Sequence, residues 1–202
     1  MRSRFALPVL LALPGLALAI AGFFHPHQLT YDTSTQWWVL HVPGLLVFPL
    51  VGAALATLVR GRADTLSWVV RLAAYTYATF YTALDVINGI AAGYVTHALG
   101  PGVPRSDEIR ALFEIGRPIG DVGEWALLAT CLAVAVDQVL RHGVWALPGF
   151  ALLPGAWLVR SDHIFAPLGV LGMTIIALST GYLAWSAGRN IPEEISRRAT
   201  AT

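Results

Sequence analysis

Histidines are the residues of this chain best suited to chemistry, and five of the six lie near the ends of long apolar segments. Neutral imidazole is the commonest protein ligand for zinc, copper and iron, and such sites are assembled from segments far apart in sequence. His25 and His27 come from one short loop, so they offer two ligands at once. The sequence therefore predicts a site for zinc or copper, with these candidate ligands: His25, His27, His41, His97 and His163. The alternative is that these imidazoles only form hydrogen bonds with lipid headgroups and loops at the membrane surface.

Carboxylates supply the second part of the predicted site. Asp85 lies inside an apolar stretch, where a charge costs about 2.5–3.5 kcal/mol, so we expect it to face the interior as an acid or base. Tyr81 and Asn88 share its side of a helix and would orient it as ligand-binding residues. Asp121 and Glu124 are three residues apart and are expected to be supporting catalytic carboxylates. The alternatives are a structural anchor at Asp85 and ordinary helix-start acids at Asp121 and Glu124.

The composition is that of an integral membrane protein. Of the 202 residues, 56% are hydrophobic and 12% charged, and the mean hydropathy is +0.63. A soluble domain averages about a quarter charged residues. The chain has no lysine, which excludes a Schiff base and a P-loop, and its single cysteine, Cys131, excludes an intrachain disulfide. The net charge of +1 gives no sign of nucleic-acid binding.

Apolar runs near the roughly 20 residues that a bilayer requires predict one all-α domain over residues 1–202, a bundle of six transmembrane helices. Arginines favour the side that carries both termini, so we expect an N-in, C-in protein of the cell membrane. Between the third and fourth spans, an N-cap at Ser106 or Asp107, acids in the first turn and a stop at Gly116 predict a short amphipathic helix on the outer surface. The expected spans are residues 5–24, 37–59, 66–97, 119–140, 144–160 and 164–187.

This topology brings the five histidines to the outer face, although they are spread through the sequence. We therefore expect an outward-facing pocket of histidines and carboxylates, in a metal-dependent membrane enzyme or a metal-handling protein. Its partners would be the lipid bilayer and a small molecule or metal ion, and the chain would form a homo-oligomer or join a larger membrane complex. The residue pattern does not decide whether it is an enzyme.

Three alternatives remain open. The Pro-Gly pattern of residues 43–49 recurs at 148–154, which in opposed halves would indicate an inverted 3+3 repeat and a small proton-coupled transporter. Gly89 and Gly93 form a GxxxG suited to helix packing, as in a non-catalytic subunit or assembly factor. His41 and His97 lie at comparable depth in neighbouring spans, so the pair would suit a b-type haem.

Overall fold

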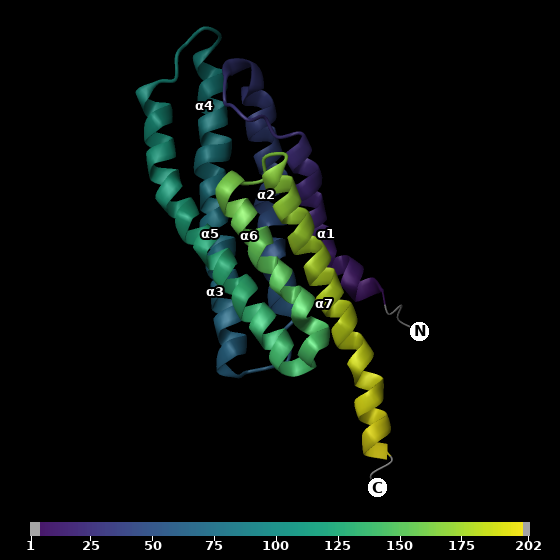
Figure 1. The fold of residues 1–202 in the computed structure, drawn as a ribbon. Coiled ribbons are helices and arrows are strands. Elements are labelled where there is room, and N and C mark those ends of the chain that lie inside the picture. Colours follow the sequence, from purple (N-terminus) through teal and green to yellow (C-terminus); the bar gives the residue numbers. More distant parts are fainter. Residues whose placement is uncertain (1–4, 200–202) are drawn as a thin grey trace.

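The chain is helical throughout the part that the structure describes. The computed structural model describes residues 5–199, with side chains through residue 188, and contains no strand in that part (Figure 1). The long rod of residues 65–99 consists of three helical elements joined end to end. The elements are α1 (Ala6–Phe23), α2 (Tyr31–Thr57), α3 (Thr65–Leu84), the π-helix η1 (Asp85–Ala91), α4 (Ala92–Leu99), α5 (Asp107–His142), the 3-10 segment η2 (Gly143–Ala151), α6 (Leu152–Asp162) and α7 (Leu168–Ala199).

The structure contains helices long and apolar enough to cross a membrane, which is compatible with the membrane protein predicted from composition. Among the described residues four helical stretches qualify: Ala6–Phe23, Tyr31–Thr57, Asp107–Asp162 and Leu168–Gly188. Large apolar side chains point outward from these helices, with Leu46 73% and Leu140 76% exposed. Contiguous exposed apolar surface of this kind suits contact with lipid. The count of six spans and their orientation stay predictions.

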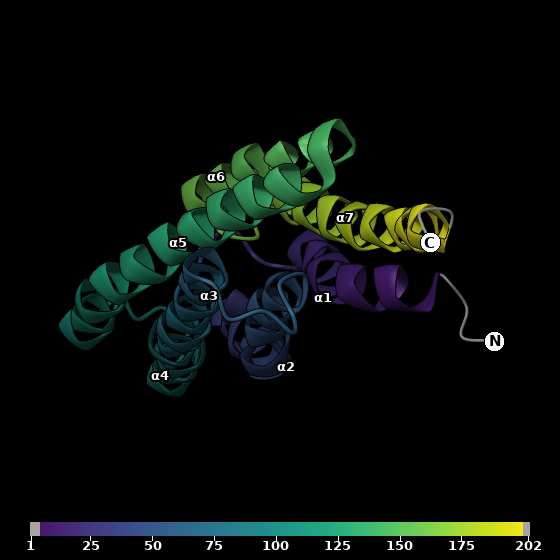
Figure 2. The same ribbon diagram turned by 90° about the horizontal axis from the view of Figure 1, so that it is seen from below.

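The helices form two layers. Seen from below, α5, α6 and α7 lie in one row, and α3, α2 and α1 lie in a second row beneath it (Figure 2). The most extensive contacts between the rows join α3 to α5 and α1 to α7. Between the layers lies an apolar core that includes Phe48, Tyr77, Leu127, Met173 and Leu183.

The predicted short surface helix is wrong in its limits. Residues 107–115 are instead the first turns of the 36-residue helix α5, which runs on through Gly116 and Pro118. Ser106 caps this helix as expected, since its side chain accepts a hydrogen bond from the Ile109 amide. Gly116 serves close packing and not termination, because a Cβ there would overlap the amide of Asn88 on η1.

At the end of the bundle that carries the α2–α3 turn, an ion-pair cluster joins the two layers. Asp137 of α5 is 1% exposed, and Arg62 donates a hydrogen bond to its carboxylate. Arg141 lies 3.8 Å from the same carboxylate, and Arg62 also pairs with Asp64. These arginines belong to the basic side predicted from sequence. The other terminal members of that set lie outside the residues whose side chains are described: Arg2, Arg4, Arg189, Arg197 and Arg198.

Candidate metal centre

Three of the five predicted histidine ligands meet at one point. One ligand atom from each of His25, His41 and His163 lies within 4.8 Å of the other two, so the three residues could hold a metal ion. They come from the α1–α2 turn, from α2 and from the α6–α7 turn. Both turns lie in the half of the molecule away from the C-terminus (Figure 1). His25 and His41 are buried, whereas His163 is partly exposed.

Hydrogen bonds fix how His25 and His41 present their rings. Nδ1 of His25 lies 2.8 Å from the Pro26 carbonyl oxygen, and Nδ1 of His41 lies 2.7 Å from the Trp37 carbonyl oxygen. A carbonyl only accepts, so each Nδ1 carries the proton and donates it. Each Nε2 of the neutral rings then carries a lone pair, and these two Nε2 atoms lie 3.5 Å apart. Two acceptors facing each other need a cation or a proton between them, and a donated Nδ1–H is the usual support of a metal-ligating histidine.

Burial keeps the histidines of the two turns in the neutral form that binds metal. The pKa of His25 falls to about 4, chiefly through burial and then through the neighbouring charge of a protonated His41. The pKa of His163 is also lowered, by burial first and then by His25 and His41. Protons therefore compete weakly with a metal for these nitrogens near neutral pH.

His163 is held in a backbone conformation that side chains rarely adopt. Its φ is 51° and its ψ is −130°, just after α6 ends. Such a conformation costs on the order of 1–3 kcal/mol in a non-glycine residue and is found mainly at functional sites. Tyr81 from α3 contacts Nδ1 of His163 at 2.5 Å through its hydroxyl, and the two rings stack. Tyr81 thus supports the third imidazole, whereas the sequence predicted it to orient Asp85.

Asp85 lies at the start of η1, beside the histidine cluster. Its carboxylate is 1% exposed, and Oδ1 lies 4.0 Å from Nε2 of His41. Neither of its oxygens has a hydrogen-bond partner among the described residues. An unsatisfied buried carboxylate is costly, and a cation at the cluster would provide the missing partner. The residues present therefore fit a bound metal ion.

Glycines make room for these side chains. A Cβ at Gly44 would lie 2.7 Å from Oδ2 of Asp85. A Cβ at Gly89 would overlap the His41 ring, and its distance to Nε2 would be 2.8 Å. The GxxxG of Gly89 and Gly93 thus packs against α2, as its sequence pattern predicts, and Gly89 leaves the space that the ring of His41 fills.

The cluster borders a cavity of about 560 Å³ that holds most of the predicted site. A pocket of this volume is typical for a small-molecule ligand. Asp85 and Asn88 line it from η1, and the Asn88 side-chain oxygen has no partner among the described residues. Trp37 donates to the main-chain carbonyl of Asn88 at 3.0 Å, which ties α2 to the π-helix. π-Helical turns of this kind occur often at functional sites.

Asp121 and Glu124 also line this cavity, but both bind an arginine. Arg160 of α6 donates to Oε2 of Glu124 at 2.7 Å and to Oδ1 of Asp121 at 3.1 Å. These bonds join α5 to α6. The catalytic role of Asp121 and Glu124 stays a prediction. In the structure, the two carboxylates hold α5 and α6 together through Arg160.

The two remaining predicted ligands lie outside the cluster. His27 lines the same cavity and stacks on Phe165. His97 of α4 is separate, with Nδ1 3.3 Å from the hydroxyls of Ser34 and Thr35 and its ring stacked on Tyr31. The haem pair of His41 and His97 is therefore not supported, because Nε2 of His41 faces His25 and Asp85 instead.

Other residues that were not predicted from the sequence complete the walls of the cavity. Trp37 and Phe165 surround His25, with ring centroids 4.8 and 4.6 Å from its own. Arg105 and Arg117 line the cavity and are exposed. They lie 19 and 7 residues before Glu124 and belong to no sequence motif, but guanidinium groups bind anions through paired hydrogen bonds.

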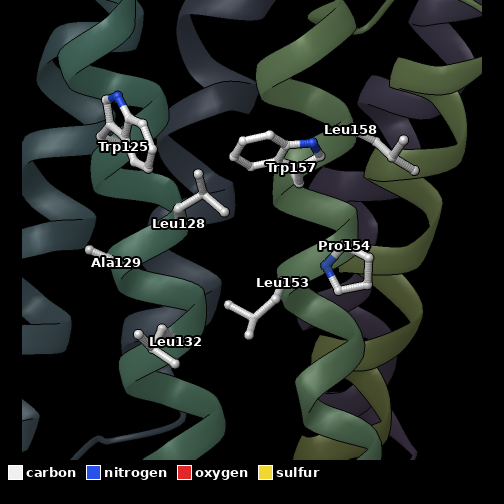
Figure 3. A pocket seen from close by; sticks show the side chains of 8 residues that line it. All are labelled: Trp125, Leu128, Ala129, Leu132, Leu153, Pro154, Trp157 and Leu158. Atoms are coloured by element: carbon white, nitrogen blue, oxygen red, sulfur yellow. The ribbon is translucent and has the colours of Figure 1, made fainter.

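A larger hollow lies elsewhere and contains no group for chemistry. It is an apolar groove of about 710 Å³ between α5 and α6, lined only by Trp125, Leu128, Ala129, Leu132, Leu153, Pro154, Trp157 and Leu158 (Figure 3). Its side chains can contact lipid but offer no metal ligand or acid. The histidine cavity is therefore the candidate site. No family model, curated protein or solved structure matches this chain, so the geometry of that cavity is what bears on its function.

Proposed function

We propose that the chain is a metal-dependent hydrolase of the cell membrane, with a divalent cation, zinc in the first place, held by His25, His41 and His163. The observation that carries the proposal is the pair of Nε2 atoms facing each other at 3.5 Å while both Nδ1 atoms donate to carbonyls. Three imidazoles and an open position are the ligand set of many zinc hydrolases. Copper(I) is less suited, because the cluster contains no sulfur ligand.

Hydrolysis assigns separate tasks to the residues of the cavity. Zinc in such a site supplies a water whose pKa is near neutral and polarises the bond to be cleaved. Asp85 would take a proton from the attacking water while the oxygen of that water bonds to the acyl carbon or phosphorus of the substrate. The bond to the leaving oxygen would then break, and Asp85 would give the proton to that oxygen. Tyr81 and the two carbonyls hold the imidazoles in place.

The size of the cavity favours an enzyme over a metal carrier. A metal ion needs only its ligands and a few waters, whereas about 560 Å³ adjoin the cluster. We further propose six membrane crossings with both termini in the cytoplasm. The excess of arginines on one side supports this orientation, and so does the side-by-side arrangement of α1 and α7.

The test uses the zinc-loaded full chain in detergent against a panel of carboxylic and phosphate esters. We expect turnover in the wild type, none in His41→Ala, and metal binding without turnover in Asp85→Asn. Full activity of the chelator-treated protein, or of Asp85→Asn, would contradict the mechanism. His97→Ala is the matched control, because this histidine lies outside the cluster.

A proton-coupled transporter is the second candidate function. Two layers, each made largely of consecutive segments, favour it because an inverted 3+3 repeat would be arranged in this way (Figure 2). Proteoliposomes with an imposed pH gradient would separate the two functions. A transporter would accumulate a solute in response to the gradient, whereas the hydrolase would not.

A further inference from the structure

An apolar groove begins at the histidine cluster, and its first hollow shares His25 and His41 with the polar cavity. This hollow of about 250 Å³ is lined by His25 and His41, by apolar residues of α1 and α2, and by Ile164 of the α6–α7 turn. Asp85 lies just behind its wall, next to Gly44, which lines the hollow. The two histidines therefore separate a polar space from an apolar one.

A second hollow continues the first along the same two helices. Its volume is about 430 Å³, it reaches Thr57, and it shares Ala17 and Val47 with the first hollow. Together the two line α2 from Leu40 to Thr57, a length of about 25 Å at 1.5 Å per residue. One leaflet of a bilayer core is about 15 Å thick. The groove is therefore long enough for a whole lipid chain.

The groove opens toward the surface that would face lipid. Leu13 and Leu50, which line the second hollow, are 50% and 51% exposed. Ile20, which lines the first hollow, is 61% exposed. Both α1 and α2 are long and apolar enough to cross a membrane. A hydrocarbon chain can enter such a groove sideways from the bilayer.

The polar cavity, in contrast to the apolar groove, is lined by positively charged side chains. Arg105 and Arg117 line it, and neither forms an ion pair with a carboxylate among the described residues, whereas Arg160 is held by two. Arginine binds phosphate and carboxylate groups through paired hydrogen bonds. An anionic group thus fits one side of the histidine cluster and an apolar chain fits the other.

We propose that the substrate is an amphipathic lipid with an anionic headgroup, with its head at Arg105 and Arg117, its chain in the α1–α2 groove, and the bond to be cleaved beside His25 and His41. This inference rests on the proposed function for the cleavage step. The binding of the lipid itself does not require the metal, so the two can be tested apart.

The test measures lipid binding to the metal-free full chain by native mass spectrometry. The probes are two lysolipids with the same sixteen-carbon chain, anionic lysophosphatidic acid and zwitterionic lysophosphatidylcholine. We expect the anionic lipid to bind about tenfold more tightly and Arg105→Gln/Arg117→Gln to abolish that preference. Arg110→Gln is the control, since Arg110 pairs with Asp107 outside the cavity.

Two matched substitutions test the groove. Ala17 is exposed at the junction of the hollows, so Ala17→Phe should block the groove without disturbing the core and weaken both lipids by about tenfold. Ala129 is an exposed alanine in the α5–α6 groove of Figure 3, and Ala129→Phe should leave binding unchanged. Val47→Phe is the second variant if Ala17→Phe does not fold.

Several results would overturn the inference. Unchanged lipid binding in Ala17→Phe and Val47→Phe, or a loss of binding in Ala129→Phe instead, would show that the hydrocarbon chain of the lipid lies elsewhere. Equal binding of the two lipids, or displacement of the anionic lipid by inorganic phosphate alone, would show that no anionic lipid is selected. Lipid binding as predicted in a protein that takes up no zinc would refute the proposed hydrolase and leave the lipid site in place.

Discussion

Gly89→Ala tests the metal centre through a residue that cannot itself bind metal. The added Cβ would overlap Cγ and Cδ2 of His41 and lie 2.8 Å from its Nε2, whereas ordinary contacts begin at 3.4 Å. Nε2 must therefore retreat by more than about 0.6 Å, against a tolerance of about 0.2 Å in a metal–ligand distance. The cluster would lose one of its three ligands. We expect zinc affinity to fall about 100-fold, which corresponds to about 3 kcal/mol.

Gly93→Ala provides the matched control one turn further along the same helix face. Its Cβ would lie 2.9 Å from Cβ of Trp38 and 3.0 Å from Cδ1 of Trp37, so it crowds α2 without touching His41. Both variants should lose about 1–3 kcal/mol of stability through overpacking. Zinc affinity is measured by competition with a chelator, and stability by thermal unfolding in detergent. Equal zinc affinity in the two variants would refute the placement of His41 as a ligand.

Three further predictions concern the supports of the site and of the fold. Tyr81→Phe removes the hydroxyl that contacts His163 but keeps the ring, so zinc affinity should fall about 10- to 100-fold in the same chelator assay, and an unchanged affinity would exclude this support. The metal-free protein should lose stability as pH falls from 6.5 to about 4, because the pKa of His25 is lowered on folding and the unfolded chain takes up the proton first. The full loss is about 3 kcal/mol, and His25→Gln should flatten this part of the melting-temperature profile. Asp137→Ala should cost about 1–3 kcal/mol in thermal unfolding, since it leaves Arg62 without its buried partner, and zinc affinity should stay the same.

The helical structure and its stretches long and apolar enough to cross a membrane could be predicted from the sequence, because hydropathy reports them directly. The start of α5 at Ser106 followed from its capping pattern. The continuation of α5 through Gly116 could not be predicted from the sequence. A glycine that is required for close packing against Asn88 looks the same in the sequence as a glycine that ends a helix. Local pattern alone does not distinguish the two cases.

The types of residue in the candidate site could be predicted from the sequence, but not which of these residues come together. His25, His41, His163 and Asp85 were all named from sequence, and the structure brings them together. His97 was grouped with them because depth along a span does not give the direction in which a side chain points. The roles of Arg105, Trp37 and Phe165 depend on how distant helices pack, which no short pattern carries.

The most direct test of the metal centre is elemental analysis of the full chain, purified in detergent without chelators and without an affinity tag. The predicted result is about one zinc ion per chain in the wild type and in His97→Ala, and almost none in His41→Ala. A wild-type protein that contains no metal and takes none up from zinc-containing buffer would contradict the central claim. Equal zinc in the wild type and His41→Ala would contradict it as well.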